Sequence, residues 1–441
     1  MHKSLSLAAT ALALAALAPA TASAAWSAPT TLSDTNLSNP TAQGAFGGSV
    51  LTGWLTPTAA LSKRLGPPAA ITAADPYEKV WAAGLDQAGN AVVLTVRRHK
   101  PFQRVRVTFV AADGTRSATR TISTTPRSSA QPQLSVAPDG TAVAGWAWHD
   151  AAGWRAQAAV RRAGQAAFDA PQTVSPPAPV AGRFQSRPII HVAAGDGGRG
   201  ALTWQFGGSE GVPASPLHVL TAGIDAKFGA DQALDGAGDF ADVGLAVGAE
   251  GAVQLAWLDM HFTGRVTGSN LRVSQGTAGA PLSAPAVVSA GGKGTSSGNQ
   301  VAATFSADGT ATVAWAKPGS HYEEGGTLEV FTRAPGAGFG AAQTVAQNAE
   351  GLALAGGPGA SAALAWMVTT QHPKSVSHAV HAAIRPQAGG PFGAEETISD
   401  TSVHGLWPSV AMTPDGDAIA AWISNTDGSG GGTPTAAMAH P

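Results

Sequence analysis

The sequence predicts an all-β protein made of repeated four-stranded antiparallel sheets. Two patterns support this fold class: an apolar hairpin that ends on a tryptophan recurs along the chain, and a glycine-rich signature follows several of these hairpins. Composition supports it as well, since the chain has 55 glycines to form turns, no cysteine, and only 12% charged residues. An exported protein without disulfides has to be held together by its apolar core, which a large all-β fold can provide.

The hairpin is clearest in "LSVAPDGTAVAGWAW", residues 134–148, where two apolar runs flank Asp139-Gly140. Asp-Gly suits a tight two-residue hairpin turn, because both residues can adopt positive φ. The runs are short and rich in Val, Ala and Leu, as expected for buried strands. Copies of the hairpin end on Trp54, Trp146, Trp204, Trp257, Trp315, Trp366 and Trp422, and an eighth copy has Thr95 in place of the tryptophan. We expect these tryptophans to pack between neighbouring sheets.

The second signature is seen in "RRAGQAAFDAPQTVS", "RAPGAGFGAAQTVA" and "RPQAGGPFGAEETIS". Each string fits the end of one strand, a glycine-rich turn, a covering phenylalanine (Phe168, Phe339 or Phe392) and a further strand. Together with the hairpin this makes a unit of four antiparallel strands, which recurs about every 50 to 60 residues. That spacing and strand count predict the blades of a β-propeller. A parallel β-helix repeats at shorter spacing, and immunoglobulin-like domains repeat at about 100 residues.

The ends of the chain predict how the propeller closes. The last unit has three strands, and "AAWSAPTTLSDT" near the N-terminus parallels "GPFGAEETISDT" at the end of the preceding unit. An N-terminal strand that completes the last blade would close the ring and remove two sheet edges. We therefore expect a single propeller domain over residues 25–441 with eight blades. Seven blades are the alternative, if the short first unit or the degenerate second one is merged.

The N-terminus also predicts export. Residues 1–24 combine the basic residues His2 and Lys3, an apolar run and the small-residue end Ala22-Ser23-Ala24, which is the layout of a secretory signal peptide. The apolar run is too short to span a bilayer. Net charge is −2, which gives no field to attract nucleic acid or anionic lipid. We expect a secreted, extracellular or cell-surface monomer without a membrane span, and predict no nucleic-acid partner, cofactor or metal.

At the level of the repeat, the chain resembles the secreted bacterial repeat β-propellers and, more loosely, the sialidase-like propeller superfamily. The resemblance covers nearly the whole chain after residue 24. True Asp-boxes read Ser-x-Asp-x-Gly-x-Thr-Trp, whereas here glycine follows Asp139, Asp308 and Asp415 directly and tryptophan comes seven residues after each aspartate. The Phe-Arg-Ile-Pro motif of sialidases is also missing. The resemblance implies the fold, and these departures argue against sialidase activity.

Candidate ligand-binding residues lie in the loops that face away from the Asp-Gly turns. Three arginines in links between blades could clamp a carboxylate or sulfate through their planar guanidinium groups. Two tryptophans outside the repeat register, each with a neighbouring histidine, could contact a ligand. Histidines recur in these loops, but their variable offsets from the tryptophan favour structural or solvated roles over a metal site. The candidates are Arg127, Trp148, His149, Asp150, Arg183, Arg187, His404 and Trp407.

Two functions remain open from the sequence. The first is a non-enzymatic binding or scaffold propeller that recognises a glycan or a protein, and the second is a sialidase-like hydrolase or lyase that acts on carbohydrate. No catalytic residue is assigned, because acidic side chains occupy several links and a glycosidase needs two of them facing each other. The two readings differ in one prediction: an enzyme requires a pocket in which two carboxylates, or arginines and a carboxylate, converge.

Overall fold

The fold is described from a computed structural model of the 441-residue chain. The described residues are 25–31, 37–38, 40–46, 49–54, 58–63, 69–72, 78–99, 102–124, 128–181, 184–207, 214–234, 242–263, 266–293, 300–318, 326–372, 375–426 and 431–440. Among them every regular element is a β-strand and the sheets are antiparallel. None of the described residues forms a helix with the length and apolar character needed to cross a membrane.

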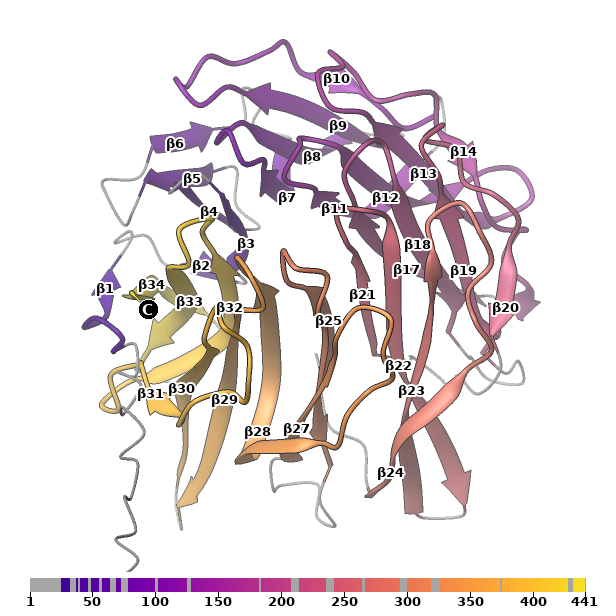
Figure 1. The fold of residues 1–441 in the computed structure, drawn as a ribbon. Coiled ribbons are helices and arrows are strands. Elements are labelled where there is room, and N and C mark those ends of the chain that lie inside the picture. Colours follow the sequence, from indigo (N-terminus) through magenta and orange to yellow (C-terminus); the bar gives the residue numbers. More distant parts are fainter. Residues whose placement is uncertain are drawn as a thin grey trace, which may run out of the picture.

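Most strands form four-stranded meanders (Figure 1). Four of the sheets are β3 (Pro40–Phe46), β4 (Ser49–Trp54), β5 (Thr58–Lys63), β6 (Ala69–Thr72); β7 (Glu78–Leu85), β8 (Ala91–His99), β9 (Phe102–Val110), β10 (Arg120–Thr121); β11 (Ser128–Val136), β12 (Ala142–His149), β13 (Trp154–Arg161), β14 (Gln172–Thr173); and β17 (Pro188–Ala194), β18 (Gly200–Phe206), β19 (Leu217–Ala222), β20 (Gln232–Leu234). A fifth sheet is β21 (Val243–Val247), β22 (Ala252–Thr263), β23 (Val266–Thr277), β24 (Ala286–Lys293). A short ribbon of β15 (Val180–Ala181) and β16 (Phe184–Gln185) precedes β17.

The C-terminal part departs from this simple pattern in two places. Seven strands share one sheet: β25 (Val301–Phe305), β26 (Ala311–Lys317), β27 (Gly326–Arg333), β28 (Gln343–Gly356), β29 (Ala362–His372), β30 (Ser375–Arg385) and β31 (Glu396–Thr397). Long β28 pairs with β27 through its first half and with β29 through its second half, so it joins two meanders. The last sheet contains β32 (His404–Met412), β33 (Ala418–Asn425) and β34 (Gly431–Ala439), with β1 (Thr30–Thr31) and β2 (Leu37–Ser38) paired to β34.

The sheets are arranged around a common axis with the first strand of each meander innermost. The innermost strands contact one another in the order β7, β11, β17, β21, β25, β28 and β32, and β3 contacts both β32 and β7. All-β sheets in this arrangement are consistent with a β-propeller. Because the innermost strands run in one direction, the Asp-Gly turns share one end of the molecule. The β12–β13, β29–β30 and β33–β34 connections lie at the other end, which we call the loop face.

The Asp-Gly turns differ from the predicted two-residue form. The amide of Gly140 donates to Ala137 O and the amide of Ala137 donates to Thr141 O, so the connection has five residues. Gly140 has φ of 90°, and the Asp139 carboxylate accepts the Thr141 amide hydrogen at 2.7 Å. Residues 137–140 form a four-residue turn whose last residue is a left-handed glycine, and this geometry also matches the twist of the flanking strands. The same bond pattern recurs at Gly309 and Gly416.

The repeated tryptophans form the core between sheets, as predicted. Six of them are buried to 1% exposure or less: Trp146, Trp204, Trp257, Trp315, Trp366 and Trp422. Trp204 belongs to a cluster that includes Val143 and Ala158 of the preceding sheet, and Trp366 packs with Leu328 in the same way. The tryptophan spacing in the sequence therefore reports one packing position repeated from sheet to sheet.

A buried arginine of the glycine-rich signature links neighbouring meanders. Arg385 is 1% exposed, and its guanidinium donates to Ala360 O, Thr332 Oγ1 and Ser306 Oγ at 2.7 to 3.1 Å. Its guanidinium also lies 5.5 Å from the ring centre of Phe392. The arginine of this signature therefore does more than flank the turn, because it donates to backbone and hydroxyl acceptors that burial has removed from water.

His191 on β17 makes the protein sensitive to acid. Burial lowers the pKa of this imidazole from 6.5 to about 4. The unfolded chain therefore binds a proton that the folded chain excludes, so stability falls as pH drops from 6.5 towards 4. We expect a loss of at most ~3 kcal/mol from this group, and less because the side chain keeps some contact with solvent. Denaturant unfolding of His191→Gln at pH 7 and pH 4.5 should show a smaller loss than the parent; equal losses would contradict this assignment.

Candidate functional site

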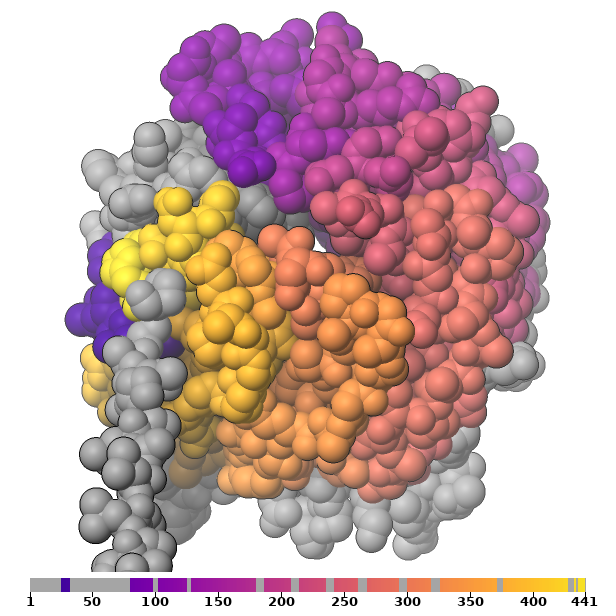
Figure 2. Space-filling view, in the orientation of Figure 1, coloured from indigo at the N-terminus to yellow at the C-terminus, as the bar shows by residue number. Residues whose placement is uncertain are grey.

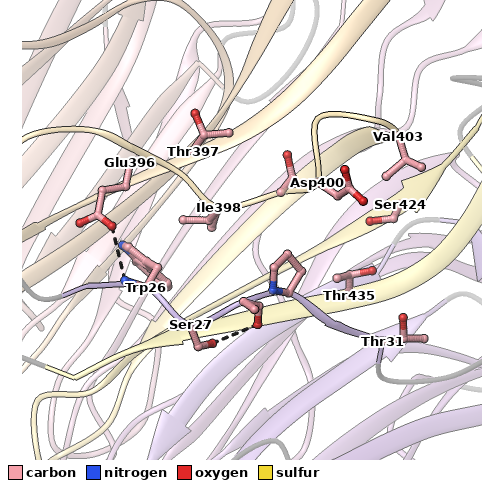
Figure 3. Close-up of a pocket in the computed structure, with 13 residues that line it drawn as sticks. Trp26, Ser27, Thr31, Glu396, Thr397, Ile398, Asp400, Val403, Ser424 and Thr435 are labelled. Atoms are coloured by element: carbon pink, nitrogen blue, oxygen red, sulfur yellow. Dashed lines mark hydrogen bonds between the residues drawn. The ribbon is translucent and has the colours of Figure 1, made fainter.

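The N-terminal and C-terminal parts of the chain enclose a pocket at one seam between sheets (Figure 3). We call it the seam pocket; it has a volume of about 570 Å³ and lies between β31 with its following loop, β33, β34 and the segment leading into β1. The side chains that matter chemically are Trp26, Ser27, Thr31, Glu396, Thr397, Ser399, Asp400, Ser424 and Thr435. They supply an indole ring, two carboxylates and six hydroxyl groups.

The wall formed by Trp26 is held in place by pairing with the last strand. Thr30 and Thr31 pair with Ala436 and Thr435, and Trp26 forms a bridge to Ala439. The Trp26 amide hydrogen is also donated to Glu396 Oε2, with nitrogen and oxygen 3.4 Å apart. Residues about 370 positions apart in sequence are thereby brought to one pocket, so the seam pocket exists only when the N-terminal segment is docked.

Asp400 remains a strong acceptor at neutral pH. Hydrogen bonds from the backbone and side chain of Ser402 lower the pKa of its carboxyl group below the ordinary value. A carboxylate with a lowered pKa stays ionised and accepts hydrogen bonds, but it does not serve as a proton donor. No lysine, arginine or histidine lines the pocket among the residues that the structure describes. The described lining thus offers carboxylate and hydroxyl groups as its polar side chains.

The predicted residues His404 and Trp407 lie on β32, in the sheet whose strands β33 and β34 supply part of the pocket wall. Val403, which lines the pocket, directly precedes His404, and the His404 ring lies 5.3 Å from the ring of His378 on β30. Trp407 is 41% exposed and has φ of 51°. It occupies a bulge that interrupts the pairing of β32 with β33.

The bulge of β32 has a counterpart of the same shape in β11, but the β11 bulge has no exposed aromatic ring like that of Trp407. Gln131 has φ of 50° in the matching bulge of β11, and a proline follows both Gln131 and Trp407. A non-glycine residue at positive φ costs about 1–3 kcal/mol and often marks functional positions. The bulge itself is thus part of the repeated architecture. The exposed ring of Trp407 in the bulge of β32 is the feature that could contact a ligand.

Three other predicted residues, His149, Asp150 and Arg187, lie near Trp154 at the start of β13, on a different sheet. His149 meets the Trp154 ring edge-on at 5.0 Å, and the guanidinium of Arg187 lies 4.8 Å from the Trp154 ring centre. Asp150 pairs with Arg155 at 2.9 Å and accepts the amide hydrogens of Ala152 and Gly153, which shapes the loop. Arg187 is exposed, while Trp148 and His149 are half-buried.

The predicted set therefore falls into two groups on separate sheets. One group is His149, Asp150 and Arg187 near Trp154, and the other is His404 and Trp407 on β32. Trp148 lies apart from both, because it packs on the opposite side of β12 against the cluster of Leu94 and Trp146. Arg127 and Arg183 lie outside the described residues. The sequence did not point to Trp26 or Glu396 as ligand residues, since each is ordinary in its own local pattern. Their only signal was the predicted pairing of the N-terminal segment with the last unit.

A second cavity, of about 820 Å³, follows the axis towards the Asp-Gly turns. Seven innermost strands line it, and the opening between the sheets is visible near the centre of Figure 2. Polar side chains on its wall already bind neighbouring backbone, as when Ser135 accepts the Ala194 amide hydrogen and Thr304 accepts that of Gly356, each at 3.0 Å. The axial cavity offers few side-chain groups to a polar ligand.

Comparison with known proteins does not assign the chain to a family. No family model matches the chain, and no curated protein matches its sequence. Solved structures with a similar course of the chain include an ulvan lyase of a polysaccharide lyase family, with 10% identity, a TM-score of 0.47, and coverage of 91% of this chain and 94% of the lyase. The NanB sialidase of Streptococcus pneumoniae has 6% identity and a TM-score of 0.41, with 93% of each chain covered. A streptogramin B lyase has 8% identity and a TM-score of 0.44, with 93% of this chain and 97% of the lyase covered.

Proposed function

We propose that the protein is an exported, monomeric β-propeller that binds a neutral extracellular glycan in the seam pocket. The observation that carries this proposal is the pocket's combination of an indole, two carboxylates and several hydroxyls without a basic side chain. Carboxylates accept hydrogen bonds from sugar hydroxyls, serine and threonine hydroxyls both donate and accept, and an aromatic ring packs on the apolar face of a sugar. The two carboxylates have no basic side chain beside them in the described lining, so they disfavour acidic glycans by charge repulsion.

We include the number of blades and the closure of the ring in the same proposal. The sheets would form eight blades if the two halves of β28 belong to successive blades. In the closed ring, β1 would supply the fourth strand of the last blade. The pairing of β1 with β34 and the contacts of β3 with β7 and β32 support this closure. Residues 1–24 would be removed on export, which would place the new N-terminus next to Trp26 at the rim of the pocket.

Binding can be tested with the chain from residue 25 onward on a glycan array, followed by calorimetry with the best oligosaccharide. We expect Glu396→Gln and Asp400→Asn each to weaken binding by about 10- to 100-fold, because a hydrogen bond to a charged group contributes ~1.5–3 kcal/mol. Glu395→Gln is the matched control: Glu395 is the adjacent carboxylate in sequence, and it lies 3.9 Å from His381 without lining the pocket. Equal loss in all three variants, or in none, would contradict the proposed site.

A carbohydrate-active hydrolase or lyase is the second candidate. It is favoured by one observation, that Glu396 and Asp400 line the same pocket. The lowered pKa of Asp400 keeps this carboxyl group ionised, so in such a pair Asp400 would be the base or nucleophile and Glu396 the proton donor. Turnover of the bound oligosaccharide that is lost in Glu396→Gln or Asp400→Asn would establish catalysis. Binding without turnover, equally sensitive to these changes, would support the binding protein.

A further inference from the structure

The hydroxyl groups of the seam pocket differ in where their protons go. Ser27 Oγ accepts the Met438 amide hydrogen at 3.1 Å and donates to Ala28 O at 3.2 Å. Thr435 Oγ1 donates to Thr433 O at 3.3 Å. These two hydroxyls already donate their protons to backbone carbonyls, so they offer a ligand only lone pairs.

Ser424 on β33 is held by a group that can only donate. Its Oγ accepts the indole hydrogen of the buried Trp422 at 3.0 Å. Trp315 and Trp366 occupy the same position in other units, and their indole nitrogens have no hydrogen-bond partner among the described residues. Because an indole N–H cannot accept, the proton of the Ser424 hydroxyl has to point elsewhere. No acceptor for it is found in the described part of the chain, so this proton is available at the pocket wall.

Ser399 is held in the same way by a backbone amide. Its Oγ accepts the Val380 amide hydrogen at 2.9 Å. Ser175 has the matching position after β14 and accepts an amide hydrogen of β13 at 2.8 Å, but it also donates to Pro176 O at 2.8 Å. Asp400 follows Ser399 where a proline follows Ser175. The structure shows no acceptor for the Ser399 proton within the residues it describes, so this proton too is available to a ligand.

An acceptor and apolar side chains complete the lining. The exposed Asp400 carboxylate accepts the Ser402 amide hydrogen through Oδ1 at 2.8 Å, and its further lone pairs can accept from a ligand. Trp26 and Val403 contribute half-buried apolar surface. Figure 3 shows Ser424 below the loop that carries Asp400 and Val403. The pocket thus combines two hydroxyl donors, a carboxylate acceptor and apolar walls.

We propose that Ser399 and Ser424 donate to the carbonyl oxygen of an acetamido group, so that the seam pocket selects glycans that contain N-acetylated amino sugars. A carbonyl oxygen has two lone pairs and no proton, which matches two hydroxyl donors. The amide N–H of the acetamido group donates to the Asp400 carboxylate, and its methyl group contacts the apolar walls. Trp422 is a positioning residue, since it acts only through Ser424. This inference rests on the proposed glycan site and narrows it to one class of sugar.

Other sugar substituents match the lining less well. A hydroxyl group brings a proton of its own and no methyl group, so it leaves the apolar surface of Trp26 and Val403 uncovered. A carboxylate or sulfate accepts from both serines, but it is repelled by Glu396 and Asp400. An acetamido group is neutral and presents an acceptor, a donor and a methyl group together.

Triacetylchitotriose and cellotriose are matched probes, because they differ only in an acetamido or a hydroxyl group on each ring. We expect calorimetry to show about 10-fold tighter binding of the acetylated probe to the parent protein. Ser399→Ala and Ser424→Ala should each lower this preference by about 3- to 10-fold through the loss of one hydrogen bond, with little change for cellotriose. Ser424→Thr keeps the hydroxyl and should keep the preference. Ser175→Ala is the control, since it removes the corresponding serine of another sheet.

Equal binding of the two probes by the parent, or an equal loss for both probes in the alanine variants, would overturn the inference. Deacetylated chitotriose tests attraction by charge: tighter binding of this amine than of the acetylated probe, unchanged in both serine variants, would also overturn it. If another neutral glycan binds and Asp400→Asn abolishes this, while the acetylated probe does not bind, the glycan site stands and the acetamido inference fails. If no glycan binds, both fail.

The positioning role of Trp422 has a readout without ligand. The indole N–H signal of Trp422, assigned from its loss in Trp422→Phe, should move upfield in Ser424→Ala and stay near its parent position in Ser424→Thr. Trp422→Phe should also lower the preference for the acetylated probe more than it weakens cellotriose binding. An unmoved indole signal in Ser424→Ala, or equal weakening of both probes in Trp422→Phe, would overturn this role.

Discussion

Replacement of Trp315 by alanine is expected to lower the free energy of unfolding by about 3–5 kcal/mol. The Trp315 ring is fully buried, in a cluster with Leu258 and Val301 that joins two successive meanders. Loss of the indole removes its burial from water and leaves a cavity that the rigid strands cannot refill. Denaturant unfolding followed by circular dichroism measures the change. A loss below about 1 kcal/mol would contradict the packing role assigned to the repeated tryptophans.

Phenylalanine substitutions separate packing from hydrogen bonding at this position. Trp146 donates its indole hydrogen to Gln157 Oε1 at 3.2 Å, whereas the indole nitrogen of Trp315 has no partner among the described residues. Trp146→Phe therefore leaves a buried amide oxygen unpaired and should cost about 1–3 kcal/mol more than Trp315→Phe. Equal costs would mean that the bond from Trp146 contributes nothing to stability.

Removal of residues 25–31 is expected to destabilise the protein and to abolish glycan binding together. The deletion takes away the indole of Trp26, which packs against the cluster of Val410 and Trp422, and this burial alone contributes about 2 kcal/mol. It also leaves β34 as an open sheet edge, which favours pairing between molecules. Unfolding curves, light scattering and calorimetry of the shortened protein measure the three effects.

Trp26→Ala in the full chain is the matched control for this deletion. It keeps the pairing of Thr30 and Thr31 with β34 but removes the wall of the pocket. We expect it to weaken binding without increasing self-association. A shortened protein that is as stable and as active in binding as the parent would show that the N-terminal segment neither closes the ring nor forms the pocket.

The architecture could be predicted from sequence because it is repeated. Asp139 and Trp146 recur at one spacing in several units, and each copy reinforces the assignment of the others. The turn geometry could not be derived in the same way, since Asp-Gly fits both a two-residue turn and the longer turn that the Ala137–Thr141 hydrogen bond produces. Local sequence fixes the residue with positive φ but leaves the length of the loop open.

Only part of the candidate site could be predicted from the repeat pattern in the sequence. His404 and Trp407 stand out as exceptions to the repeat, and the structure places both on β32, where His404 directly follows Val403 of the seam pocket. Trp26 and Glu396 meet through the docking of distant segments, and no spacing in the sequence records their contact. The contact between Thr369 and His378 depends on strand register and on which face of the sheet each residue occupies. Those are properties of the folded sheet and not of any short motif.

The most direct test of the account is hydrogen–deuterium exchange of the chain from residue 25 onward, with and without the oligosaccharide that binds best. In the free protein, slow exchange of residues 30–31 would show that β1 is paired with β34. On binding, added protection should appear in residues 25–31 and 396–403, with little change around Trp154 and Arg187. Protection confined to the Trp154 group, or fast exchange of residues 30–31 in the free protein, would contradict a glycan site built by the N-terminal strand.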